Sequence, residues 1–145
     1  WGDVDFLILD LPPGTGDIQL TIVQTAELDG VVVVTTPQEV ALIDARKAIG
    51  LFERVETPIL GIIENMSYFQ CPSDGKIYHI FGEGGGEREA AKLGVPLLGK
   101  IPLDISTRFG GDEGRPVALE DPGQNPVSAA FRQVAEQCAR VVLDR

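Results

Sequence analysis

Residues 4–17 read VDFLILDLPPGTGD, a continuous apolar run that ends in an acid and a Pro-Pro-Gly turn. A strand that is apolar on both faces is typical of a parallel sheet covered on both sides, because neither face then meets water. Three further runs of this kind follow, at residues 30–36 (GVVVVTT), 58–64 (PILGIIE) and 97–101 (LLGKI). The sequence therefore predicts four buried strands, the first of them over residues 4–11.

Segments with helical periodicity separate these strands. Residues 17–26 predict a helix with Asp17 as its N-cap, and residues 39–55 predict a second helix. A last helix is predicted to begin at Asn125-Pro126, with an apolar stripe that docks on the sheet. The apolar residues expected on the buried face of the second helix are Val40, Ile43, Leu51, Phe52 and Val55.

Strands that alternate with helices, joined by right-handed crossovers, predict an α/β fold in which helices cover both faces of a parallel sheet. A chain of 145 residues that is 43% hydrophobic and 23% charged suits one folded unit over residues 1–145. The net charge of −10 argues against nucleic acid or a membrane as partner. The short apolar runs and the lack of a disulfide framework indicate a cytoplasmic protein with reduced thiols.

The segment 67–86 interrupts this alternation and is interpreted as a cysteine-containing insertion loop. It holds Cys71-Pro72, Asp74-Gly75 and a glycine cluster at residues 82–86. Long loops in compact domains often carry function. The glycines lack the lysine of a phosphate-binding loop, so they are expected to form a flexible lead into a helix that begins near Glu87.

Six segments occur in a fixed order along nearly the whole chain. They are DLPPGTGD at 10–17, TTPQEVAL at 35–42, DARK at 44–47, ENMSYF at 64–69, FG at 81–82 and IPLD at 101–104. Together they closely resemble the Mrp family of ATPases, which belongs to the MinD/ParA-like superfamily with a deviant Walker A loop. The resemblance implies a P-loop NTPase fold, ATP and Mg²⁺ as cofactors, and a dimer bridged by nucleotide.

The resemblance also implies roles for individual residues. Asp10 matches the Walker B acid that holds Mg²⁺ through water, although an isolated acid after an apolar run usually only caps a turn. Gly14 matches the switch II glycine near the γ-phosphate. Asp44 matches a helix acid at the dimer interface.

Two further residues match the positions that contact the adenine base. Asn65 corresponds to the residue whose amide reads the adenine edge, a task that suits its paired donor and acceptor. Pro102 corresponds to the residue that packs on the ring. Taken singly, Asn65 could simply end a strand and Pro102 could simply fix a turn. The ordered set of matches favours a nucleotide site.

The phosphate-binding loop of the family has no counterpart in this chain, because no segment has the form G-x-x-x-x-G-K-[ST]. In the family that loop lies upstream of the point where this chain starts. The chain is therefore expected to be the C-terminal portion of a P-loop ATPase domain. The parent protein is expected to hydrolyse ATP, and this portion alone to bind ATP poorly and to be inactive.

Members of the family commonly carry a C-x-x-C pair in the insertion, and the two pairs of a dimer hold a bridging iron–sulfur cluster. Here the segment reads Cys71-Pro72-Ser73-Asp74, so Asp74 replaces the second thiolate with a harder oxygen ligand. Cys71 could join Asp74, His79 or an external thiol in a labile metal site, keep only a redox role, or be a structural remnant. A cluster-related role is favoured, and Cys138 is assigned to the core.

The leading functional hypothesis is an ATP-dependent iron–sulfur cluster carrier. Its expected partners are a second copy of the parent chain and client proteins that lack their cluster. The alternative is a MinD/ParA-type switch in positioning or partitioning, which would use a membrane-seeking tail or a basic surface and would not need Cys71. A third hypothesis is a non-catalytic scaffold that docks on a partner.

Overall fold

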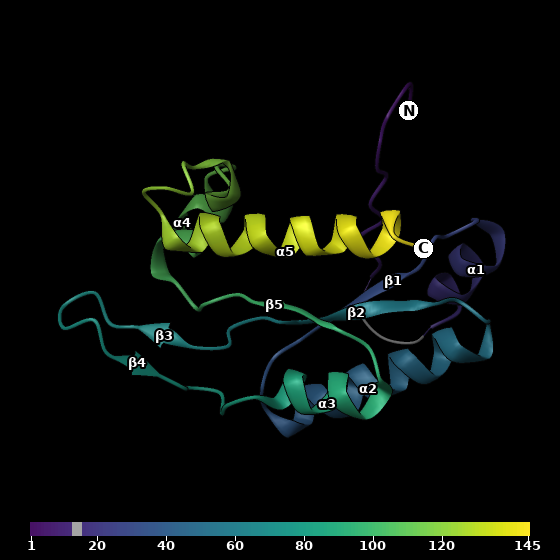
Figure 1. Ribbon diagram of the computed structural model, residues 1–145, viewed down its shortest axis with the longest axis horizontal. Helices are drawn as coiled ribbons and strands as arrows, with labels where there is room; N and C mark the ends of the chain where they lie inside the picture. The colour runs from purple at the N-terminus through teal and green to yellow at the C-terminus, as the bar shows by residue number, and fades with distance from the viewer. Residues whose placement is uncertain (13–15) are drawn as a thin grey trace.

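A three-stranded parallel sheet forms the centre of the computed structural model, which describes residues 1–12 and 16–145 (Figure 1). The strands are β1 (Val31–Thr35), β2 (Ile59–Glu64) and β5 (Leu97–Lys100), in the order β1-β2-β5. The three strands predicted from the later apolar runs are therefore confirmed to within two residues at each end, and so is their parallel arrangement.

Helices cover both faces of this sheet, as expected. Helix α5 (Pro126–Leu143) lies on one face, and α2 (Glu39–Arg54) and α3 (Gly85–Leu93) lie on the other (Figure 1). The docking of α5 is close, because a Cβ at Gly99 of β5 would sit only 2.5 Å from Cγ2 of Val134.

The last helix begins where the sequence predicts. The side chain of Asn125 accepts the backbone N–H of Val127 at 2.8 Å, and Pro126 occupies the first helical position, where its missing N–H is not needed. The remaining helices are α1 (Asp17–Thr25), α4 (Ile105–Asp112) and the short 3₁₀ helix η1 (Val117–Leu119). The N-cap of α1 is Gly16, so the prediction of Asp17 as the cap is wrong by one residue.

The core lies between β1, β2 and the pair α2 and α3. The buried side chains of α2 are those of Leu42, Ala45, Ile49 and Phe52. The predicted buried face was therefore wrong in part, since Val40 is 74% exposed and Ile43 43% exposed. Both sets of residues have helical spacing, and the position of the sheet selects between them.

The prediction of a strand over residues 4–11 is wrong. These residues run as an extended segment outside both sheets, and Ile8 is 88% exposed. An apolar run marks a segment that suits burial on both faces, but a strand also needs neighbours that accept and donate its backbone hydrogen bonds. Among the described residues, the sheet pairs β1 only with β2.

The segment 67–86 contains a small antiparallel sheet within the loop that the sequence predicts. Its strands are β3 (Phe69–Gln70) and β4 (Ile77–Tyr78), and Figure 1 shows the hairpin projecting away from the helices. An isolated parallel bridge joins Phe69 to Leu103, so the hairpin continues from the end of the main sheet.

A partly buried ion pair joins the two helices on the lower face of Figure 1. The guanidinium of Arg46 on α2 donates to both carboxylate oxygens of Glu89 on α3, at 2.8 and 2.6 Å. Glu89 is 4% exposed, and Lys92 also donates to it at 2.8 Å. The hydrogen bonds from Arg46 lower the pKa of Glu89 from 4.5 to about 2, against the opposing effect of burial.

None of the described helices combines the length and the hydropathy that crossing a membrane would require.

Candidate functional site

The carboxyl ends of β2 and β5 lie side by side, and ligands of open α/β sheets bind at such ends. Glu64 is paired with Lys100 in the ladder, and the backbone N–H of Ile101 donates to the carbonyl oxygen of Glu64 at 2.9 Å. Asn65 directly follows Glu64, and Pro102 directly follows Ile101. The structure thus brings together the two residues that the resemblance assigns to the adenine base.

Asn65 is held firmly at the end of β2. Its backbone N–H donates to the carbonyl oxygen of Thr35 at 2.7 Å, and its side-chain oxygen accepts the N–H of Met66 at 2.9 Å. Met66 then turns with a φ of 52°, in the left-handed region. The amide of Asn65 is half-buried at the point where the chain leaves the sheet.

The turn that carries Cys71 lies at the end of the hairpin. The N–H of Cys71 donates to the carbonyl oxygen of Lys76 at 2.8 Å, and the N–H of Gly75 donates to that of Cys71 at 2.8 Å. At the other end, the N–H of Leu103 donates to the carbonyl oxygen of Tyr68 at 2.7 Å. These bonds connect the cysteine turn to the end of β5.

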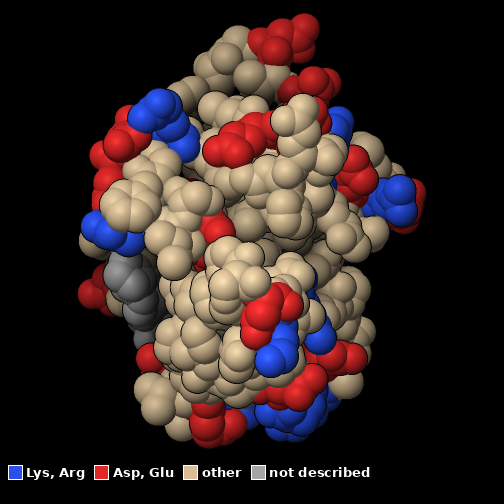
Figure 2. Space-filling model, turned by 90° about the vertical axis from the view of Figure 1, so that its left-hand side faces the viewer, with Lys and Arg blue, Asp and Glu red and all other residues tan. Residues whose placement is uncertain are grey.

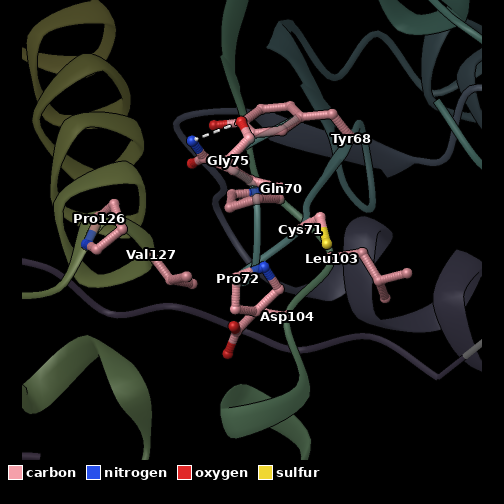
Figure 3. Close-up of a pocket in the computed structure, with 10 residues that line it drawn as sticks. Tyr68, Gln70, Cys71, Pro72, Gly75, Leu103, Asp104, Pro126 and Val127 are labelled. Carbon is pink, nitrogen blue, oxygen red and sulfur yellow. Dashed lines mark hydrogen bonds between the residues drawn. The ribbon is translucent and has the colours of Figure 1, made fainter. Parts of the chain in front are cut away.

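A hollow of about 330 Å³ lies between this turn and the end of β5 (Figure 3). Cys71 and Pro102 both line it, together with Tyr68, Pro72 and Asp104. The residue expected to hold iron–sulfur cargo and one residue expected to contact a base therefore border the same space.

Hydrogen bonds from Ser73 favour the thiolate form of Cys71. The sulfur lies 3.1 Å from the hydroxyl oxygen of Ser73, and this hydroxyl, together with the backbone N–H of Ser73, lowers the pKa of Cys71. The thiolate is the form of cysteine that attacks electrophiles and binds metal.

Asp74 is engaged with the turn itself. Its carboxylate accepts the backbone N–H of Lys76 at 3.1 Å and lies 3.3 Å from the Lys76 ammonium. The N–H of Lys76 is the main cause that lowers the pKa of Asp74. The residue that replaces the second cysteine thus closes the turn as an Asx motif.

His79 lies at the base of the hairpin, away from the cysteine turn. Its Nδ1 is 3.3 Å from the carbonyl oxygen of Ser67, and its Nε2 is 3.6 Å from Glu83. Within the described part of the chain, no three His, Cys, Asp or Glu side chains are grouped so that they could hold a metal ion. One copy of the chain therefore offers one thiolate at this turn, and the side chain of Asp74 is a hydrogen-bonding neighbour of that thiol.

Asp104 is fixed by the start of α4. It accepts the N–H of Thr107 at 2.8 Å and the hydroxyls of Ser106 and Thr107. Burial alone would raise the pKa of Asp104, but these hydrogen bonds lower it overall. A carboxylate is thereby held at the edge of the hollow.

The other residues that the sequence singles out lie elsewhere. Asp10 is exposed in the extended N-terminal segment, and Gly14 lies outside the described residues. Asp44 is exposed on α2, where its carboxylate pairs with Lys47 at 3.0 Å. Asp10, Asp44 and Asn65 are not among the residues that line the hollow. Cys138 is half-buried on α5, and burial raises the pKa of its thiol.

Glu64 is the residue that the sequence-based reasoning missed. It is fully buried, and its carboxylate accepts the hydroxyl of Ser67 at 2.5 Å and the N–H of Gly86 at 2.6 Å. The signal that could have revealed Glu64 is its position as a charged residue at the end of an apolar strand. A carboxylate buried there needs hydrogen-bond partners.

The first two glycines of α3 are closely packed, which corrects the prediction of a flexible lead for this part of the cluster. A Cβ at Gly85 would sit 2.2 Å from the carbonyl oxygen of Pro37, and one at Gly86 would sit 3.1 Å from Cβ of Glu64. Both glycines are buried in the first turn of α3. They allow the start of α3 to lie against the ends of β1 and β2.

Figure 2 shows the face on which the hairpin and α4 project. Acidic and basic side chains occur there in several small groups, and uncharged surface separates them.

Comparison with known proteins gives consistent matches. A family model described as "ParA: NUBPL iron-transfer P-loop NTPase" matches residues 1–139. A Pyrococcus furiosus protein named iron-sulfur cluster carrier protein is 51% identical over 94% of this chain and 46% of its own length. The chain spans about half the length of the curated relatives it matches.

Two solved structures share the fold. A nucleotide-binding protein from Archaeoglobus fulgidus, in complex with ADP, is 44% identical with a TM-score of 0.71, and the match covers 79% of this chain and 47% of that one. The cell division ATPase MinD from Pyrococcus furiosus is 26% identical with a TM-score of 0.71, over 94% of this chain and 52% of that one.

Proposed function

Because the chain belongs to the ParA family of NUBPL-type iron-transfer P-loop NTPases, we propose that it carries iron–sulfur clusters as cargo under the control of an adenine nucleotide. The observation that carries this proposal is the hollow that Cys71 and Pro102 share. A cysteine whose pKa is lowered lines the same hollow as Pro102, one of the two residues predicted to contact the base, and this supports the proposal. The names of the relatives at about 50% identity support the same function.

The single thiolate of each chain suits a carrier better than a permanent cluster protein. Iron–sulfur clusters are ordinarily held by four protein ligands, most often thiolates. Two copies of this chain would supply two thiolates, one Cys71 each, and thiols of a client protein would complete the set. A cluster held by few ligands exchanges readily, as delivery requires. The proposed partners are therefore a second copy of the chain and apo client proteins.

The predicted base position fits a flat aromatic ligand. Pro102 and Tyr68 give apolar surface to the hollow, and the amide of Asn65 is fixed at the end of the neighbouring strand. The complex of the Archaeoglobus fulgidus protein with ADP supports an adenine nucleotide as the ligand. Phosphate binding, Mg²⁺ at Asp10, the role of Gly14, the dimer contact at Asp44 and ATP hydrolysis belong to the whole protein and are proposals for it. One unit over residues 1–145 and a cytoplasmic location are proposed from the sequence.

A nucleotide-driven switch in positioning or partitioning is the second candidate, and the likeness to MinD favours it. Such a switch would bind nucleotide through the same strand ends and would not depend on Cys71. Loss of the Cys71 thiol should therefore abolish the function of a cluster carrier and leave that of a switch intact.

Anaerobic reconstitution with iron and sulfide tests the proposal. The protein is expressed from its whole gene, because the curated relatives are about twice as long as this chain. Cys71→Ser is compared with Cys138→Ser as the matched control, since both remove one thiol. We expect iron, sulfide and the visible absorption of a cluster in the wild type and in Cys138→Ser, and their loss in Cys71→Ser. Equal and negligible iron in all three proteins would favour the switch.

A further inference from the structure

Glu64 is a buried carboxylate with a defined set of hydrogen bonds. It ends β2, and none of its surface is exposed. One oxygen accepts the hydroxyl of Ser67 at 2.5 Å, and the other accepts the backbone N–H of Gly86 at 2.6 Å. Both oxygens therefore have a donor, which removes much of the cost of burying the charge.

The two donors come from opposite ends of the cysteine-containing segment. Ser67 begins the segment 67–86 and Gly86 ends it, and between them the chain runs out to the Cys71 turn and back. Gly86 lies in the first turn of α3, where backbone N–H groups have no partner within the helix. One side chain thus closes the base of the whole hairpin.

The same residue is bonded to the end of β5. The carbonyl oxygen of Glu64 accepts the N–H of Ile101 at 2.9 Å, and the carbonyl oxygen of Ile101 accepts the N–H of Ser67 at 3.0 Å. Asn65 follows Glu64 directly, and Pro102 follows Ile101. Glu64 therefore lies at the junction of the predicted base position and the hairpin.

We propose that Glu64 is a positioning residue, whose carboxylate holds Ser67 and Gly86 together and so sets where the Cys71 turn lies relative to Asn65 and Pro102. The use of these positions for nucleotide and cluster rests on the proposed function. The holding of the two segment ends rests on the hydrogen bonds alone.

The chain offers a matched control in Glu89. This carboxylate is also buried, but it lies on α3 itself and its partners are Arg46 of α2 and Lys92 of α3. Loss of Glu89 should weaken the packing of α3 on α2 and leave both ends of the cysteine segment bonded to Glu64. Comparison of the two residues separates positioning of the hairpin from general stability.

Hydrogen–deuterium exchange on the protein without nucleotide or cluster tests the proposal. The reporter amides are those of Ser67, Cys71 and Leu103, which donate within the hairpin base and turn. In Glu64→Ala we expect their exchange to rise about ten-fold or more, the factor expected for loss of a hydrogen bond to a charged group. The amide of Ile62, which donates to the carbonyl oxygen of Pro96, should change far less.

A conservative variant provides rescue. In Glu64→Gln the side-chain oxygen can accept the N–H of Gly86 and the side-chain nitrogen can donate to the hydroxyl of Ser67. We expect exchange close to the wild type in this variant. We also expect the alkylation rate of Cys71 to change in Glu64→Ala and to return to the wild-type value in Glu64→Gln.

The proposal is overturned if Glu64→Ala and Glu89→Ala give the same exchange profile, or if the reporter amides in Glu64→Ala exchange as in the wild type. Should Glu64→Ala fail to fold, Ser67→Ala removes one of the two bonds and is expected to raise exchange at the same amides, with no change again contradicting the proposal. Failure of cluster reconstitution in the wild type would contradict the proposed function, but it would not affect the conclusion from hydrogen–deuterium exchange about Glu64.

Discussion

At the residue scale, Cys71 combines a favoured thiolate with a place beside a hollow. The cause is local, because Ser73 donates to the sulfur from two residues away. Cys138 has the opposite setting, since burial on α5 raises the pKa of its thiol. The two cysteines should therefore differ in reactivity near neutral pH.

Ser73→Ala tests the origin of this difference. Removal of the hydroxyl takes away the largest cause of the lowered pKa, so the pH midpoint of Cys71 alkylation should move upward and the rate at neutral pH should fall. The measurement is the iodoacetamide rate against pH in a Cys138→Ser background. Identical pH profiles with and without the Ser73 hydroxyl would contradict this account.

At the element scale, the start of α3 is built around close contacts, and the one at Gly85 leaves no room for a side chain. Gly85 meets the carbonyl oxygen of Pro37 after β1, and Gly86 meets Glu64 at the end of β2. The Arg46–Glu89 pair then joins α3 to α2. These contacts fix the helix that ends the cysteine segment.

Gly85→Ala should lower the free energy of unfolding by about 1–3 kcal/mol, because the new Cβ would sit 2.2 Å from a backbone oxygen that cannot move aside freely. Gly50→Ala is the matched control, since a Cβ at this position on α2 meets no atom within 4 Å. We expect that control to raise stability by about 0.4–1 kcal/mol. Urea unfolding measures both, and equal effects of the two substitutions would argue against the close contact.

Glu89 makes stability depend on pH. The pKa of Glu89 is 4.5 in the unfolded chain and about 2 in the folded protein. Glu89 therefore contributes to the free energy of unfolding above about pH 4.5, and this contribution is lost as the pH falls toward 2. The difference in unfolding free energy between wild type and Glu89→Gln should therefore shrink over that range. Urea unfolding at a series of acidic pH values measures this difference. The control is Asp44→Asn, which removes a carboxylate from an exposed ion pair. A constant difference across this pH range would show that the ionisation of Glu89 does not contribute to stability.

Elements whose signals lie within their own residues could be predicted from the sequence. Strands β1 and β2 follow β-branched runs, and Asn125-Pro126 caps α5 as expected. The state of residues 4–11 depends on a neighbouring strand, which the run itself does not encode. The hydrogen bonds of Glu64 depend on Gly86, which is distant in sequence and near only in the fold.

At the scale of the whole molecule, the proposed site lies where three parts of the chain meet. The ends of β2 and β5 supply Asn65 and Pro102, and the hairpin supplies Cys71. The extended segment at residues 4–11, which does not belong to the proposed site, leaves apolar side chains exposed near the N-terminus. Asn65 and Pro102, 37 positions apart in the sequence, come together because the strands that they follow are neighbours in the sheet.

Cluster transfer tests most directly whether the protein delivers a cluster through Cys71. Wild type, Cys138→Ser and Cys71→Ser, each treated with iron and sulfide, are mixed with an apo-ferredoxin in the presence of an iron chelator, and the circular dichroism of the acceptor's cluster is followed. The account predicts equal transfer from the wild type and Cys138→Ser and none from Cys71→Ser. Transfer that is the same with and without the Cys71 thiol, or that the chelator abolishes in every sample, would contradict it.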